Sequence, residues 1–200
     1  MLFNIPNILT VSRIVAIPIV VIFLYIGGEW GNWLAFSAYT YACITDFFDG
    51  YLARAWHQQS AFGRFLDPIA DKLLVAGVLL MLVGAHTITA YHVLPAAIIL
   101  CREILVSGLR EFLAEARVSM PVSLLAKWKT TIQMLALGFL IVGVVGPDFG
   151  PYGPIGPVST LEIGLFGLWA AALITIITGY DYLCSGLRHI SEADRGNSGG

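Results

Sequence analysis

Four aspartates stand out chemically in this chain of 200 residues. Asp46 and Asp49 are three residues apart, and Asp67 and Asp71 are four apart, so on helices each pair shares one face. All four lie in long apolar stretches, where a charged side chain is costly and indicates function. Close carboxylates repel each other, and either protonation or bound cations relieves that repulsion. Ligands that are all oxygen favour hard ions such as Mg²⁺ or Mn²⁺, and four carboxylates suit a pair of them.

A simpler interpretation is that these aspartates cap helices and anchor them at a membrane surface, paired with Arg54, Arg64 and Lys72. That interpretation suits a single aspartate at a helix end, whereas four at these spacings favour a functional pocket. Gly50 and Ala53 follow Asp49 on the same stretch. Their small side chains permit either close helix packing or the close approach of a flat ligand.

The composition identifies the medium in which these aspartates act. The chain is 58% hydrophobic and 12% charged, with a mean hydropathy of +0.80 and a net charge of −2. A soluble domain carries about 25% charged residues, so we expect lipid to surround most of this chain. The small net charge does not indicate a nucleic-acid partner. Six apolar segments are long enough to cross a bilayer, which takes about 20 helical residues. They cover residues 8–26, 33–54, 65–85, 92–112, 124–145 and 161–184.

The eleven Lys and Arg residues set the orientation. All of them lie at or toward one side of this arrangement, which the positive-inside rule assigns to the cytoplasm. The sequence therefore predicts an all-α integral membrane protein with six transmembrane helices, both termini in the cytoplasm and the aspartate pocket at the cytoplasmic face. We expect one membrane domain over residues 1–190 and, because residues 191–200 are polar and glycine-rich, a disordered tail.

The aspartates belong to a longer pattern, Asp46-x₂-Asp49-Gly50-x₂-Ala53-Arg54-x₈-Gly63-x₃-Asp67-x₃-Asp71. This pattern resembles the signature of the CDP-alcohol phosphotransferase family, with every fixed position occupied. The segments 6–13, 102–111, 127–130 and 178–182 look like those of its bacterial phosphatidylglycerolphosphate synthases. The resemblance extends over essentially residues 5–185.

The resemblance implies a reaction in which an acceptor hydroxyl attacks the lipid-bearing phosphorus of CDP-diacylglycerol and CMP leaves. It implies two Mg²⁺ or Mn²⁺ ions on Asp46, Asp49 and Asp67, with Asp71 as general base that also contacts metal. It places the donor on Asp46, Asp49, Gly50, Ala53, Arg54 and Gly63. It further implies a homodimer in the bacterial cytoplasmic (inner) membrane, surrounded by membrane lipids.

Basic residues on the fourth and fifth segments indicate an anionic acceptor such as glycerol 3-phosphate. Anchoring explains Lys127 and Lys129 equally simply, and Arg102 has Glu103, Glu111 or Asp181 as alternative partners. With two residues of the opening segment added, the expected acceptor site is Thr10, Arg13, Arg102, Arg110 and Lys127.

Other functions stay open at this point. Within the family the acceptor could be phosphatidylglycerol, as in a cardiolipin synthase, or serine or inositol phosphate. A divalent-cation transporter would also use carboxylates inside the membrane. However, the acidic residues gather at one face with no relay toward the other, which argues against transport. Within the family, the likeness of segments 102–111 and 127–130 to those of phosphatidylglycerolphosphate synthases favours glycerol 3-phosphate as the acceptor.

Overall fold

The structure is a computed structural model that describes residues 5–55, 61–115, 124–148 and 158–197. Within these ranges it describes the side chains at 8–48, 63, 65–114, 124–143, 145–148 and 158–186. The described residues form six α-helices and two short 3₁₀ helices, so the all-helical prediction is confirmed. The helices are α1 (Ile5–Ile26), α2 (Gly28–Ala55), α3 (Ala61–Gly84), η1 (Ala90–His92), α4 (Val93–Glu115), α5 (Leu124–Val142), η2 (Gly143–Val145) and α6 (Thr160–Asn197).

Each apolar segment identified in the sequence lies, to within a few residues, on one of the six long helices. The connection between α1 and α2 is the shortest between long helices, because α2 begins two residues after α1 ends. It depends on glycine, since Gly27 and Gly28 have φ of 66° and 71°. A side chain is strained in that left-handed region, so glycine is the residue that reverses the chain there. The fifth segment ends differently from the prediction, because residues 143–145 continue as η2, starting at Gly143 with φ of 51°.

The C-terminal end of α6 differs from the prediction of a disordered tail over residues 191–200. The helix continues to Asn197, and residues 198–200 lie outside the described part of the chain. The continuation has a local reason. Residues 191–195 contain no glycine or proline, and Glu192, Ala193 and Arg195 include good helix formers that extend a helix already nucleated upstream.

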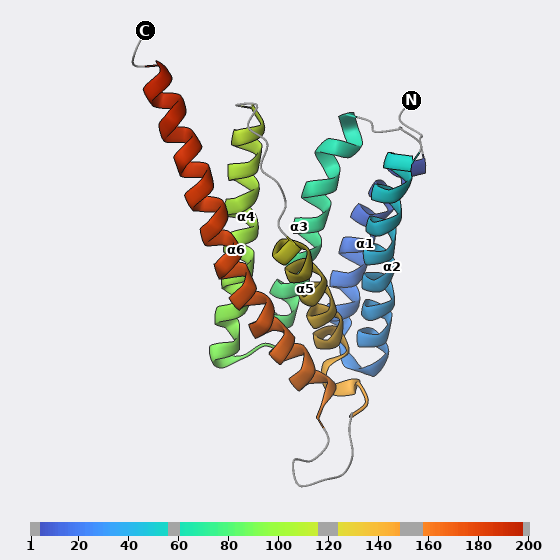
Figure 1. Cartoon of the computed structure of the whole chain (residues 1–200). Helices are drawn as coiled ribbons and strands as arrows, with labels where there is room; N and C mark the ends of the chain where they lie inside the picture. The colour runs from blue at the N-terminus through green and yellow to red at the C-terminus, as the bar shows by residue number, and fades with distance from the viewer. Residues whose placement is uncertain (1–4, 56–60, 116–123, 149–157, 198–200) are drawn as a thin grey trace.

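The helices pack as two groups of three. In the first group α1 packs against α2 and α3, and in the second α6 packs against α5 and α4. The groups meet where α5 contacts α2 and α3 and where α3 contacts α4, which places α3 and α5 in the middle of the bundle (Figure 1). A continuous core of buried apolar side chains crosses this junction and includes Val20, Ala35, Leu74, Ile99 and Leu168.

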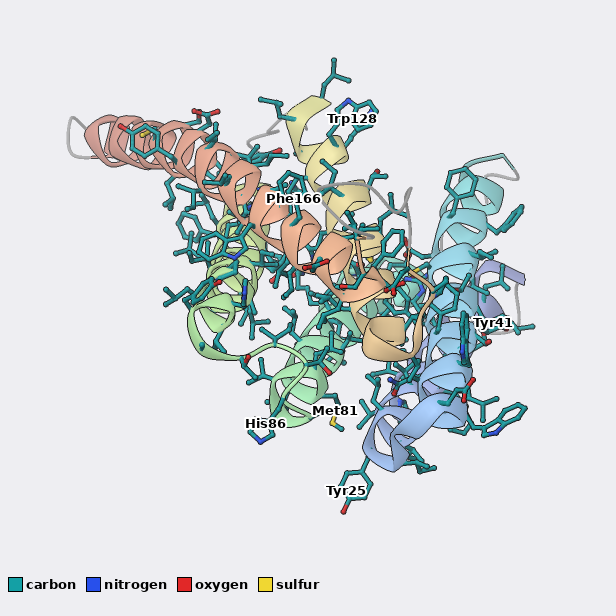
Figure 2. All side chains as sticks on the ribbon, turned by 90° about the horizontal axis from the view of Figure 1, so that it is seen from below. Tyr25, Tyr41, Met81, His86, Trp128 and Phe166 are labelled. Carbon is teal, nitrogen blue, oxygen red and sulfur yellow. The ribbon has the colours of Figure 1, made fainter. Side chains whose placement is uncertain are left out.

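Many large apolar side chains lie on the outside of the bundle. Tyr25, Trp30, Phe166 and Leu80 are each more than 70% exposed, and Tyr25 and Trp128 point away from the bundle (Figure 2). Among the described residues, four helical stretches are long and apolar enough to cross a membrane. They are Ile8–Ile26, Ala90–Ala114, Leu124–Val142 and Thr160–Gly186. These features are those of an integral membrane protein.

Candidate active site

Helix α1 ties the two aspartate-bearing helices together. The guanidinium of Arg13 forms an ion pair with Asp46 of α2, with 2.5 Å between Nη1 and Oδ1. One turn earlier, the hydroxyl of Thr10 donates a hydrogen bond of 2.7 Å to Oδ1 of Asp67 on α3. Both α1 side chains are buried, at 0% and 1% exposure, and a buried charge is stable only when it is paired. Thr10 and Arg13 are three residues apart on one face of α1, so the two contacts hold Asp46 and Asp67 against the same helix.

Asp71 connects these carboxylates to the second group of helices. It lies one turn beyond Asp67 on α3, so the two share a face. Its carboxylate is within electrostatic reach of Asp46 and Arg13 on one side and of Glu103 and Lys129 on the other. Asp71 thus lies where the two groups of helices meet.

A cavity of about 440 Å³ opens beside Asp71, between α3, α4 and α5. Basic side chains from all three helices line it, together with two glutamates of α4. Most of the α4 lining comes from positions spaced by three and four residues, so one face of that helix is turned toward Asp71. The lining residues are Pro68, Asp71, Lys72, Arg102, Glu103, Val106, Ser107, Arg110, Glu111, Ala114, Ala126, Lys129 and Thr130.

The wall of the cavity that α4 and α5 form is held by a buried ion pair. The ammonium of Lys129 contacts Oε1 of Glu103, and the lysine side chain is only 2% exposed. The guanidinium of Arg102 is farther from the same glutamate, at 3.8 Å, and donates instead to the hydroxyl of Thr178 on α6 at 3.2 Å. Glu103 therefore pairs closely with Lys129 and only weakly with Arg102. The wall formed by α4 and α5 is left with more positive than negative charge.

The structure brings together part of the acceptor site expected from the sequence. Arg102 and Arg110 line the cavity, as expected for an anion site. Lys127 is exposed and absent from the lining, whereas Lys129, two residues on, is buried in it. Thr10 and Arg13 contact Asp67 and Asp46, and they too are absent from the lining.

The helical phase of α5 explains why Lys129, and not the expected Lys127, lines the cavity. Ala126, Lys129 and Gln133 are buried at i, i+3 and i+7, the spacing of one helix face. Lys127 and Trp128 fall outside that stripe. This signal is readable in the sequence, where apolar residues continue the stripe at Ala136 and Leu140. Sequence reasoning also missed Glu103 as the partner of Lys129, and Tyr182, whose contacts depend on how α6 packs.

The expected donor site lies only partly within the described residues. Gly63 is buried near the start of α3, and Asp46 and Asp67 are placed as above. The side chains of Asp49, Gly50, Ala53 and Arg54 lie outside the described set, although their backbone belongs to α2.

The donor set suits a hard cation, because every expected ligand is a carboxylate and each carboxylate has two oxygens. Asp46 and Asp67 use one oxygen each toward Arg13 and Thr10. Among the described side chains, no three acidic, histidine or cysteine residues lie close enough together to hold a metal. The expected set also includes Asp49, whose side chain is not among the described ones.

A second cavity, of about 590 Å³, runs along α2 and α5 and is lined almost entirely by apolar side chains. It begins next to Asp46, since Cys43, Phe47 and Phe48 line it, and it continues toward Trp33 and Val142. An apolar cavity that starts at a polar site is the shape expected for an amphipathic ligand.

Comparison with known proteins identifies the class to which this fold and site belong. Residues 3–178 match the family model of CDP-alcohol phosphatidyltransferases, and the chain belongs to that family. The match includes all four aspartates and most of the six helices.

Individual relatives share one name. The CDP-diacylglycerol–glycerol-3-phosphate 3-phosphatidyltransferase of Rickettsia bellii (strain RML369-C) is 46% identical over 90% of this chain and 93% of its own. The protein of that name from Cereibacter sphaeroides is 40% identical over 95% and 98%. The one from Escherichia coli (strain K12) is 46% identical over 70% and 78%.

Proposed function

We propose that this protein transfers the phosphatidyl group of CDP-diacylglycerol to sn-glycerol 3-phosphate, giving phosphatidylglycerol phosphate and CMP. The observation that carries the proposal is the cavity in which Asp71 faces Arg102, Arg110 and Lys129. A base and a group of cations on opposite walls suit an acceptor that has both a hydroxyl and a phosphate. The names of the relatives describe the same reaction.

The cations on α4 and α5 bind the phosphate of glycerol 3-phosphate. Arginine can make two parallel hydrogen bonds to a phosphate, and contacts between charged groups are the strongest hydrogen bonds in proteins. Arg102 and Arg110 make these contacts, and Lys129 adds a third positive charge while it stays paired with Glu103. Serine, a zwitterion with no phosphate and no net charge, would neutralise these cations less completely.

Asp71 accepts the proton of the attacking hydroxyl. The oxygen of that hydroxyl forms a bond to the phosphorus bearing the diacylglycerol, the bond from this phosphorus to the CMP oxygen breaks, and CMP takes the electron pair. General-base assistance of this kind is worth about 10²–10⁴-fold. The described side chains near Asp71 offer no nucleophile with an adjacent histidine, and the direct displacement requires none.

The carboxylates of Asp46, Asp49, Asp67 and Asp71 would hold two Mg²⁺ or Mn²⁺ ions. Such ions, when bound, stabilise the charge on the pyrophosphate of the donor. Arg13 and Thr10 keep Asp46 and Asp67 in place for that role. Gly50, Ala53, Arg54 and Gly63 would contact the cytidine and its phosphates, and the apolar cavity beside Asp46 would receive an acyl chain.

We further propose that all six long helices cross the bacterial cytoplasmic (inner) membrane, with both termini in the cytoplasm, and that the protein forms a homodimer. Support for the topology comes from the lysines and arginines, which lie at or toward one side. It also comes from the bundle, because α1 begins and α6 ends at the same end (Figure 1). The aspartates and the polar cavity lie toward this end as well.

The test is CMP release by the purified full-length protein with CDP-diacylglycerol and Mg²⁺, comparing glycerol 3-phosphate, phosphatidylglycerol, serine and inositol phosphate as acceptors. We expect turnover with glycerol 3-phosphate alone, abolished by EDTA. Turnover with another acceptor would leave the donor site standing and overturn the role of the cations. Absence of CMP release with every acceptor would favour the cation-transport alternative, which uptake of Mg²⁺ into proteoliposomes would then reveal.

A further inference from the structure

One feature of α6 has no part in the reaction proposed above. Thr178 and Tyr182 are four residues apart, so they lie on one face of the helix, and both are buried. That face packs against α4, the helix that carries the arginines of the polar cavity. The contacts between the two helices therefore decide where those arginines lie.

Arg102 runs along the surface of α6. Its Nη2 donates to the hydroxyl of Thr178 at 3.2 Å, and its guanidinium carbon is 5.7 Å from the centre of the Tyr182 ring. Gly179 makes this course possible, because a β-carbon added there would lie 3.2 Å from Cγ of Arg102. A β-carbon at 179 would require the Arg102 side chain to shift by a few tenths of an ångström.

Arg110 reaches the same ring from the other direction. It lies eight residues after Arg102, a rise of about 12 Å along α4, yet its guanidinium carbon is 5.6 Å from the centre of the Tyr182 ring. A second close approach supports this geometry, since a β-carbon on Gly186 would come within 2.8 Å of the Leu109 side chain. The ring of Tyr182 is thus a shared contact for both guanidinium groups.

The ring lies directly behind the polar cavity. It packs against Val106 and Ala126, which both line that cavity. Its hydroxyl is buried and has no hydrogen-bond partner among the described residues. Packing and the two guanidinium contacts therefore hold the ring in place, without help from the hydroxyl.

An aromatic contact has a consequence that an acidic partner would not have. A carboxylate would orient an arginine but also cancel its charge, whereas a ring attracts the cation and leaves its charge available. Among the described residues Arg110 makes no ion pair, and Arg102 has only the 3.8 Å contact with Glu103. Both groups are ordered by Tyr182 while they remain able to attract an anion.

We propose that Tyr182 is a positioning residue that holds Arg102 and Arg110 as a convergent, charged pair for the phosphate of the acceptor. This inference rests on the proposed function, since it requires glycerol 3-phosphate to occupy the cavity between α3, α4 and α5. Tyr182 acts through the arginines and does not itself bind substrate, and the face of the ring is the part that matters.

Two substitutions at this position separate the ring from the hydroxyl in the full-length enzyme. Tyr182→Leu removes both guanidinium contacts, and we expect the KM for glycerol 3-phosphate to rise about tenfold. The KM for CDP-diacylglycerol should change less than about twofold, because Tyr182 lines neither the apolar cavity along α2 and α5 nor the aspartate site on α2 and α3 that we assign to the donor. Tyr182→Phe keeps the ring and should stay within about twofold of wild type. Tyr180→Leu is the matched control, since Tyr180 is on the same helix and 69% exposed.

Gly179→Ala provides a second test that leaves the tyrosine in place, which matters if Tyr182→Leu does not fold. The added methyl group requires the Arg102 side chain to shift by a few tenths of an ångström, so the KM for glycerol 3-phosphate should rise by less than in Tyr182→Leu while the KM for CDP-diacylglycerol stays unchanged. An equal effect of Tyr182→Phe and Tyr182→Leu would overturn the proposal, because the hydroxyl would then be the active part. So would an unchanged KM in folded Tyr182→Leu and in Gly179→Ala.

Arg110→Ala distinguishes failure of this inference from failure of the proposed function. A raised KM for glycerol 3-phosphate in Arg110→Ala, together with wild-type values in Tyr182→Leu and Gly179→Ala, removes the positioning role alone. An unchanged KM in Arg110→Ala removes the acceptor pocket, and the positioning role is lost with it.

Discussion

The site has two halves, a carboxylate half on α1 to α3 and a cationic half on α4 to α6. The two halves differ in the sign of the charge that is in excess. Among the described side chains of α1 to α3, three aspartates stand beside the cations Arg13 and Lys72, with Arg13 in contact with Asp46 and the neutral hydroxyl of Thr10 in contact with Asp67. On α4 to α6 the cations are in excess, because Glu103 pairs closely with Lys129 and leaves the arginines to Tyr182.

The difference shows what each half needs from outside the chain. An excess of carboxylates calls for cations, which Mg²⁺ ions would supply, and an excess of guanidinium groups calls for an anion, which the acceptor phosphate would supply. Asp71 lies where the halves meet, within electrostatic reach of charged groups in both. We propose that the hydroxyl of the acceptor is activated at Asp71, on the boundary between the two halves.

The largest expected effect comes from removing the base at the boundary. Asp71→Asn keeps the shape of the side chain but cannot accept the proton, so CMP release should fall about 10²–10⁴-fold. Steady-state rates at saturating substrates measure the loss. Asp148→Asn, an exposed position near η2, is the control and should match wild type. A loss of less than threefold in Asp71→Asn would assign the base to another residue.

The buried ion pair of the cationic half should matter chiefly for stability. Among the described residues, Lys129→Met leaves Glu103, which is 17% exposed, with only the 3.8 Å contact to Arg102. The cost should thus stay below the roughly 3–5 kcal/mol of a fully buried broken pair, whereas the double variant Glu103→Gln/Lys129→Met removes both charges. Thermal unfolding in detergent should therefore show a drop in Tm for the single variant and partial recovery for the double one. Equal Tm values for Lys129→Met and wild type would mean that the pair contributes nothing.

A more selective effect is expected at Arg110, which lies in the cationic half alone. Loss of a hydrogen bond to a charged group costs about 1.5–3 kcal/mol, so Arg110→Ala should raise the KM for glycerol 3-phosphate about 10–100-fold. Lys127→Ala is the comparison, because its side chain is exposed and absent from the lining of the cavity. A greater rise in Lys127→Ala than in Arg110→Ala would restore the acceptor site expected from the sequence.

The smallest effect concerns the apolar cavity next to the carboxylate half. Gly138 lines it, and a β-carbon at this position would lie 3.4 Å from the Phe36 ring. Gly138→Leu fills part of the cavity and should raise the KM for CDP-diacylglycerol a few-fold without changing that for glycerol 3-phosphate. Gly108→Leu, which has open space around it on α4, is the matched control. A change confined to glycerol 3-phosphate would contradict the assignment of this cavity to the donor.

The long helices could be predicted because their signals are local. Apolar runs of sufficient length and the glycines at 27 and 28 place α1 and α2 without any knowledge of packing. The spacing of the aspartates likewise indicates shared helix faces. By contrast, the contacts of Thr10 and Arg13 with the aspartates depend on how α1 packs against α2 and α3.

The cationic half was harder to predict for the same reason. Helical phase separates Lys129 from Lys127, and this could have been read from the burial stripe of α5. The role of Glu103 depends on α4 meeting α5. The contact of Tyr182 with two arginines depends on α4 meeting α6, at positions that no sequence spacing connects.

Binding of radiolabelled glycerol 3-phosphate to the Asp71→Asn variant in EDTA, without donor, tests most directly whether the two halves bind their ligands separately. Our account predicts saturable binding that persists without divalent ions and is lost in the double variant Asp71→Asn/Arg110→Ala. Binding that requires Mg²⁺, or that survives the loss of Arg110, would contradict it.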